Sequence, residues 1–147
     1  MRADSGESRS SIWFSTPPLD SRHISKAARI QLAAESHDQG WCSDPSQGSW
    51  SWFEVVILAP PGDDGQTAVI KKGSDGRDLV WTSHTNPLRS DGFAWRKGKR
   101  FESDHEIWRQ LAEGDSIGVR VCAQYPGWKN TAKEGVLNVD EWLEPIF

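Results

Sequence analysis

A short polar stretch between two strand-like segments carries the side chains best suited to chemistry in this chain. It reads Ser36-His37-Asp38-Gln39-Gly40-Trp41. A His and an Asp can act as a general base and its orienting acid, or they can hydrogen-bond a sugar or another polar ligand. Adjacent residues of an extended strand point to opposite faces, which argues against His37 and Asp38 acting as a pair. The alternative is a structural turn, which Ser36 or Asp38 closes before Gly40.

Two further segments carry similar side chains. Trp81-Thr82-Ser83-His84-Thr85-Asn86 ends a predicted strand, and Pro126-Gly127-Trp128-Lys129-Asn130 contains a Pro-Gly turn. If these loops lie beside residues 36–41, they form a polar pocket with an aromatic wall. Such a pocket suits a sugar, because the C–H faces of the sugar pack on aromatic rings while its hydroxyls bond planar polar groups. The alternative is a set of unrelated loops. The predicted ligand-binding residues are His37, Asp38, Gln39, Trp41, Trp81, His84, Trp128 and Asn130.

The sequence shows no pattern typical of a metal site or of a nucleophilic catalytic site. The four His and two Cys show no zinc-ligand spacing, and Asp63, Asp64 and Asp75 lack the order of a calcium loop. The chain has no Gly-x-Ser-x-Gly motif, and the neighbours of Cys42 are acidic, which does not activate a thiol. The sequence therefore predicts no metal, no cofactor and no catalytic residue. A glycosidase built on two carboxylates, for example Glu35 and Glu54, stays open without positive support.

The length of the chain indicates one domain, and its charge argues against one class of partner. The 147 residues fit one domain, with a disordered tail predicted over residues 1–11 and a single β-sandwich domain over residues 12–147. The net charge is −4 and the basic residues are scattered, which argues against a nucleic-acid surface. The densest basic run, residues 96–100, is interpreted as a solvated loop.

The hydropathy of the chain and its cysteine content bear on its cellular compartment. No apolar segment reaches the length of a membrane span, and the first residues lack the apolar core of a secretory signal. Two Cys do not make a disulfide framework. We therefore expect an intracellular, cytoplasmic protein with two free thiols.

Hydrophobic periodicity predicts the elements that position these loops. Apolar residues recur with period two or fill short runs in several segments, which indicates strands. The expected strands cover residues 28–35, 49–56, 67–70, 78–83, 116–125 and 136–142. One short helix is expected near residues 104–112, capped by Ser103 or Asp104 and stopped by Gly114. Many short strands with one minor helix indicate an all-β fold, an antiparallel β-sandwich or jelly roll.

Four motifs occur in a fixed order along residues 24–140. They are the stretch at 36–41, Gly48-Ser49-Trp50-Ser51-Trp52-Phe53-Glu54-Val55, Gly114-Asp115-Ser116-Ile117-Gly118-Val119, and Tyr125-Pro126-Gly127-Trp128-Lys129-Asn130. In this combination the chain resembles a family of mostly uncharacterised fungal proteins. The resemblance implies a β-sandwich of the galactose-binding-like or jelly-roll type, and it carries across no catalytic residue.

Three functional hypotheses follow. The first is a non-catalytic module that binds a polar ligand, carbohydrate above all, through the Trp, His and Asp side chains of the loops. The second is a small enzyme, a lyase, isomerase or hydrolase, that uses His37 or His84 as general acid or base. The third is a protein-interaction or assembly domain whose exposed Trp are covered by another chain. The three differ in which of the nine Trp face solvent.

Overall fold

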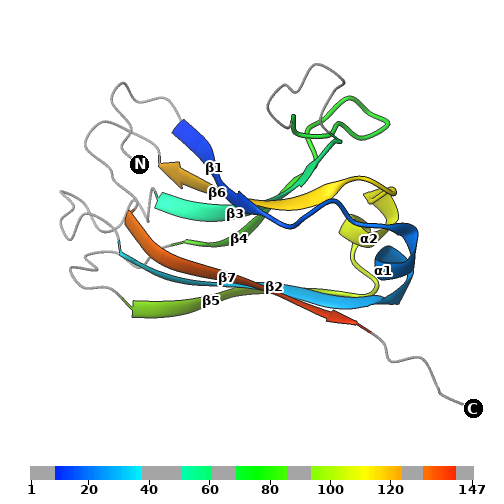
Figure 1. Ribbon diagram of the computed structural model, residues 1–147. Coiled ribbons are helices and arrows are strands. Elements are labelled where there is room, and N and C mark those ends of the chain that lie inside the picture. Colours follow the sequence, from blue (N-terminus) through cyan, green and yellow to red (C-terminus); the bar gives the residue numbers. More distant parts are fainter. Residues whose placement is uncertain (1–8, 38–50, 61–68, 86–93, 124–130, 142–147) are drawn as a thin grey trace, which may run out of the picture.

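Two antiparallel sheets packed face to face make up the fold (Figure 1). The computed structural model describes residues 9–37, 51–60, 69–85, 94–123 and 131–141. The first sheet has the strand order β1-β6-β3-β4 and the second has the order β5-β2-β7. The strands are β1 (Arg9–Ser15), β2 (Ala27–His37), β3 (Ser51–Leu58), β4 (Val80–Thr85), β5 (Ala94–Glu102), β6 (Ser116–Ala123) and β7 (Thr131–Glu141). The predicted all-β sandwich is confirmed.

Two short helices accompany the sheets. The predicted helix is α2 (Glu106–Gln110), but His105 caps it, and not Ser103 or Asp104: the Nδ1 atom of His105 accepts a hydrogen bond from the backbone N–H of Ile107 at 3.0 Å. The other helix, α1 (Ser21–Lys26), was not predicted. It has only six residues, too few for a helical period to stand out in the sequence.

The basic run at residues 96–100 is a strand and not a solvated loop. It forms the middle of β5, which pairs with β2 at the edge of its sheet. Phe101 lies opposite Ile30 and is buried, while Trp95 and Lys97 lie on the outer face. Charged side chains are common on edge strands, where they prevent pairing with other chains. That charge is also what concealed the strand in the sequence.

The first strand begins inside the segment that was expected to be a disordered tail. Strand β1 starts at Arg9 and pairs with β6, so residues 9–11 belong to the sheet and not to the predicted tail. Residues 1–8 lie outside the described residues.

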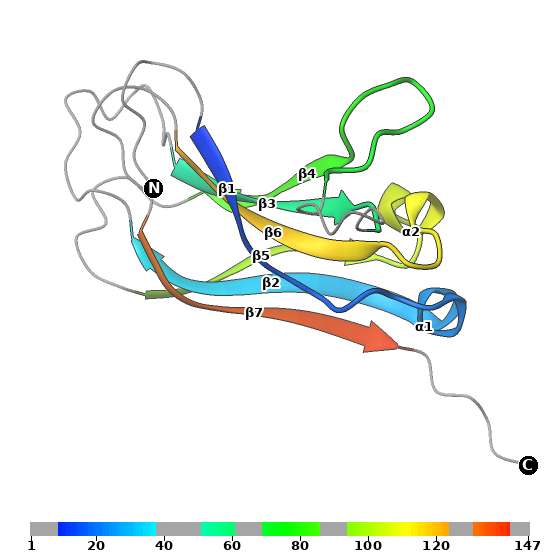
Figure 2. The same ribbon diagram turned by 45° about the horizontal axis from the view of Figure 1, so that its top comes forward.

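The strand register defines two ends of the sandwich. Trp52 lies opposite Thr85 and His37 lies opposite Thr131, so the end of β2, the start of β3, the end of β4 and the start of β7 lie at one end, which we call the loop end. Both helices lie at the opposite end, which we call the helix end, and the segment 69–79 projects there (Figures 1 and 2).

Two buried clusters fill the space between the sheets. The cluster at the helix end consists of Ile30, Val55, Ile57, Leu79, Phe101, Ile107, Leu111 and Ile117. The second cluster consists of Leu32, Ala34, Phe53, Val119 and Val121. Leu137 of β7 packs against both clusters, so they form one continuous core. The inward alternation expected for residues 30, 32 and 34 is confirmed, because all three are fully buried.

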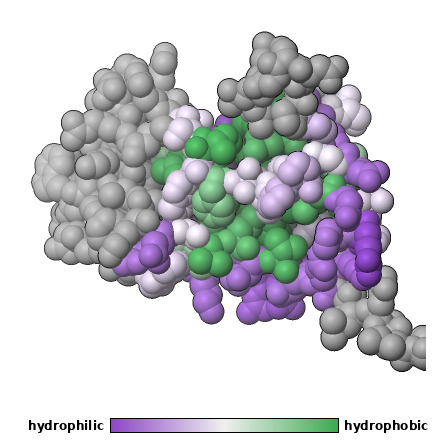
Figure 3. Space-filling view, in the orientation of Figure 1, coloured by the Kyte–Doolittle hydropathy of each residue, from purple (hydrophilic) through white to green (hydrophobic). Residues whose placement is uncertain are grey.

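Glycines allow the two sheets to meet at both edges. At one edge, a Cβ atom on Gly98 of β5 would lie 1.8 Å from the Oγ atom of Ser83 in β4. At the other edge, a Cβ atom on Gly135 of β7 would lie 2.7 Å from the ring of Trp13 and 2.8 Å from that of Phe14, both in β1. Figure 3 shows hydrophobic residues gathered between the layers on the side of β1 and β7, above hydrophilic residues of the lower sheet.

We predict that Gly98→Ala and Gly135→Ala each destabilise the fold by about 1–3 kcal/mol, because the added methyl group overpacks an inter-sheet contact. Urea denaturation measures the free energy of unfolding. Lys97→Ala is the matched control, since Lys97 is exposed on the outer face of the same strand. Alanine variants as stable as wild type would show that the sheets do not meet at these glycines.

Candidate functional site

The described residues include only part of the predicted ligand-binding set. Asp38, Gln39, Trp41, Trp128 and Asn130 lie outside the described residues. His37 is the last residue of β2 and lies opposite Thr131, at the loop end. Trp81 and His84 both belong to β4, but the structure gives them different surroundings.

His84 packs inside the sandwich. The pairing of β4 with β3 shifts by one residue between Thr82 and His84, and this bulge lets both Ser83 and His84 turn inward. The His84 ring stacks on Phe53, with ring centroids 4.9 Å apart, and its Nδ1 atom lies 2.9 Å from the Oγ atom of Ser83. Burial, and secondarily the positive charge of Arg96, lower the pKa of His84 to about 4. His84 is therefore a neutral packing residue at pH 7.

The lowered pKa of His84 makes stability depend on pH. The unfolded chain takes up the proton near pH 6.5 and the folded chain only near pH 4, so stability is lost as the pH falls between these values. We expect this group to contribute about 1–2 kcal/mol of the loss, after a reduction for its partial exposure. His84→Gln should flatten the curve of unfolding free energy against pH in this window. Parallel curves for wild type and variant would contradict the assignment.

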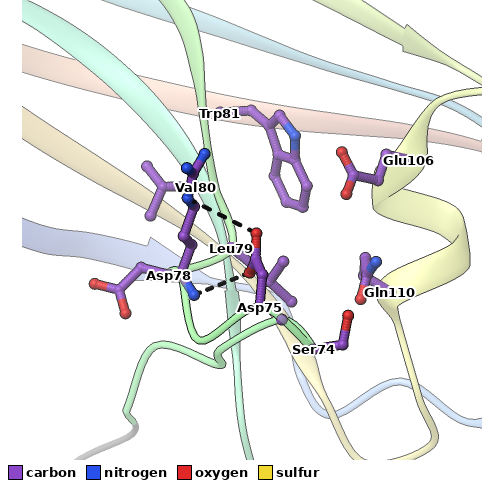
Figure 4. Close-up of a pocket in the computed structure, with 10 residues that line it drawn as sticks. Ser74, Asp75, Asp78, Leu79, Val80, Trp81, Glu106 and Gln110 are labelled. Carbon is purple, nitrogen blue, oxygen red and sulfur yellow. Dashed lines mark hydrogen bonds and ion pairs between the residues drawn. The ribbon is translucent and has the colours of Figure 1, made fainter.

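A pocket of about 320 Å³ opens at the helix end (Figure 4). It lies between the 73–80 segment, β4 and α2. Its lining residues are Gly73, Ser74, Asp75, Arg77, Asp78, Leu79, Val80, Trp81, Glu106 and Gln110. The indole of Trp81 forms one wall, and Glu106 and Gln110 of α2 lie across from it (Figure 4). Trp81 is thus the one predicted residue that the structure assigns to a described pocket.

A polar turn forms the rim of the pocket. The backbone N–H of Gly76 donates to the carbonyl of Gly73 at 3.0 Å, which closes the turn. The side chain of Asp75 accepts from the backbone N–H of Arg77 at 3.0 Å, as an Asx turn does. The turn therefore places Ser74 and Asp75 at the mouth of the pocket (Figure 4).

A partly buried ion pair holds the chain just before this segment against the end of α2. The ammonium of Lys71 donates to a carboxylate oxygen of Asp115 at 2.8 Å and to the carbonyl of Gln110 at 2.9 Å. The same oxygen of Asp115 accepts from the backbone N–H of Ala112 at 2.9 Å, and Asp115 is only 2% exposed. The ion pair thus sets the separation of the two pocket walls.

His105 fixes the aromatic wall from behind. Its ring meets the indole of Trp81 edge to face, with centroids 5.6 Å apart, and meets Phe101 in the same way at 4.7 Å. Desolvation, and then the charge of Lys99, lower the pKa of His105, so it stays neutral at pH 7. The indole therefore has a defined orientation before any ligand arrives.

Several polar side chains of the pocket have no hydrogen bond to another described residue. Asp75 pairs with Arg77 and Asp78 pairs with Lys72, at 3.8 and 3.0 Å. In contrast, the indole N–H of Trp81, the carboxylate of Glu106 and the side-chain amide of Gln110 have no hydrogen bond within the described ranges. An aromatic wall with unpartnered donors and acceptors is what a polar ligand needs.

The sequence pattern missed most of this site. The predicted site residues include neither Glu106 nor Gln110, and none of residues 73–76. The available signal was a Gly- and Asp-rich turn just before an aromatic strand. This signal alone does not identify the helix that packs opposite the turn.

Other candidate chemistries find little support in the described residues. They contain no group of three or more His, Cys, Asp or Glu suited to a metal. Cys122 is buried, and burial raises the pKa of its thiol to about 12, while Cys42 lies outside the described residues. Glu54 bonds Arg120 on the outer face of its sheet, and Glu35 lies on the outer face of the other sheet. These two carboxylates therefore cannot flank one glycosidic bond.

No family model, curated protein or solved structure matches this chain. The resemblance to a fungal family, drawn from motifs alone, stays a prediction. Neither helix in the described part of the chain is long or apolar enough to cross a membrane.

We predict that Asp115→Ala destabilises the protein by about 1–3 kcal/mol, because it leaves the ammonium of Lys71 and the N–H of Ala112 without their acceptor. Thermal and urea denaturation measure the loss. The control is Asp78→Ala, which removes an exposed ion pair with Lys72 and should cost well under about 1 kcal/mol. Equal losses in both variants would contradict a structural role for the partly buried pair.

Proposed function

We propose that this protein is a non-catalytic binding module that takes a polar ligand, a carbohydrate, into the helix-end pocket. The observation that carries the proposal is the indole of Trp81 opposite Glu106 and Gln110, whose side-chain polar atoms have no partner within the described residues (Figure 4). The pocket volume of about 320 Å³ is at the small end of the range for ligand sites. It suits one end of a saccharide chain rather than a large cofactor.

The chemistry of the lining favours a sugar over an apolar ligand. Carboxylate and amide groups form paired hydrogen bonds with neighbouring hydroxyls, and an indole packs on the C–H face of a pyranose ring. Leu79 is buried beneath this lining, and most of the rim is polar. An apolar ligand would leave Glu106 and Gln110 desolvated without partners.

Catalysis has weaker support. His84 stacks on Phe53 and does not line the pocket, so it offers no proton donor or acceptor there. His105 lies behind the indole and uses its Nδ1 atom to cap α2. The enzyme hypothesis therefore depends on His37 at the loop end.

The protein-interaction hypothesis has its own observation. Trp95 is 52% exposed and Val136 is 46% exposed, and both lie on the outer face of the β5-β2-β7 sheet. In the central strand β2, Glu35 lies opposite Trp95 and Ala33 lies opposite Val136. A sheet face with an exposed Trp and Val can contact another protein.

We predict that Trp81→Leu weakens binding of a matching saccharide about tenfold or more, because it removes the stacking face. A glycan array identifies the saccharide, and isothermal titration measures its dissociation constant. Gln110→Ala tests the opposite wall and should also weaken binding, without replacing a residue packed on the core.

Trp95→Leu is the matched control, because it removes an exposed Trp far from the pocket lining. His37→Ala tests the loop end. Loss of binding in the control or in the His37 variant, with normal binding by Trp81→Leu, would overturn the helix-end site.

A further inference from the structure

We propose that the saccharide bound in the helix-end pocket carries a positively charged amine, as a glucosamine unit does. This inference rests on the proposed function and adds the charge of the ligand. Its basis is an imbalance of charge beside an aromatic face, formed by residues from two separate elements, β4 and α2.

The first step is to identify which charges of the pocket are already compensated. Arg77 pairs with Asp75, and Lys72 pairs with Asp78. Glu106 has no cation within ion-pair distance in the described part of the chain. The pocket therefore presents one uncompensated carboxylate.

Three basic side chains around α2 make contacts outside the pocket. The ammonium of Lys71 binds Asp115 and the carbonyl of Gln110, away from the opening. Arg109 donates to the carbonyl of Asp104 at 3.2 Å. The ring of His105 packs edge to face against Trp81, behind the wall. Among the residues that line the pocket, Arg77 is the one basic residue, and it pairs with Asp75.

The indole of Trp81 also favours a positively charged ligand. The face of an indole attracts a cation, and Trp is the best of the aromatic residues at this. Trp81 and Glu106 face one another across the pocket (Figure 4), so an ammonium between them meets the ring on one side and the carboxylate on the other. Gln110 and Ser74 remain for the hydroxyls of the sugar.

A divalent metal is a poorer occupant than an ammonium. Calcium takes six to eight oxygen ligands, and magnesium needs near-octahedral oxygen coordination. Only Glu106 is free to offer a carboxylate, since the other two in the lining are paired with basic side chains. An ammonium on a sugar needs fewer ligands and also uses the ring.

The experiment compares three tetrasaccharides of the same linkage, built from glucosamine, N-acetylglucosamine and glucose. Isothermal titration at about pH 6 keeps the probe amine protonated. We expect wild type to bind the glucosamine probe about tenfold more tightly than the two neutral probes. Glu106→Gln should remove this preference, so that the three probes bind with similar affinity. Glu113→Gln, which changes an exposed carboxylate outside the pocket, is the matched control.

Each outcome bears on a separate claim. Equal or tighter binding of a neutral probe by wild type overturns the inference about charge and leaves the carbohydrate proposal standing. A preference for glucosamine that survives in Glu106→Gln, or that is lost in Glu113→Gln, overturns the assignment to this pocket. Wild type that binds no saccharide in the titration or on a glycan array overturns the proposed function, and the inference with it.

Discussion

The close approach of the two sheets at both edges is the constraint on which the rest of the structure depends. A sandwich with side chains at positions 98 and 135 would have to hold its edges apart. Because both positions are glycine, β4 reaches β5 through Ser83, and β1 reaches β7 through Trp13 and Phe14. Among the described residues, these contacts close the two sides of the core between the ends of the sandwich. Sites for ligands are therefore to be expected at the ends.

The helix end acquires a pocket because three elements meet there without filling the space between them. Strand β4 supplies Trp81, the 73–80 segment supplies a polar rim, and α2 supplies the opposite wall. The partly buried pair of Lys71 and Asp115 ties the chain just before that segment to the end of α2, so the pocket has a defined width. Rigid placement of a few polar groups around an aromatic ring lowers the entropic cost of binding a small ligand.

Trp81 and His84, which the sequence analysis assigned to one site, have different surroundings in the structure. Trp81 and His84 are three residues apart on β4, and both types suit a sugar site. The bulge at Ser83 turns His84 into the core, where it stacks on Phe53. A bulge depends on the pairing of two strands, so a single strand read alone does not disclose it. Two residues of types suited to a sugar site thus have different surroundings on one strand: Trp81 lines a pocket and His84 packs in the core.

The sequence by itself determined the fold class, most strands and the position of α2, because these depend on local hydrophobic period and turn residues. It singled out Trp81 but grouped it with the loops around residues 36–41 and 126–130, and not with the residues that line its pocket. Strand β5 escaped detection because edge strands tolerate charge on both faces, and α1 because it is short. Only the tertiary structure decided the pocket. Asp75 and Glu106 are about thirty residues apart, and they share a site only because β4 and α2 pack on the same end of the core.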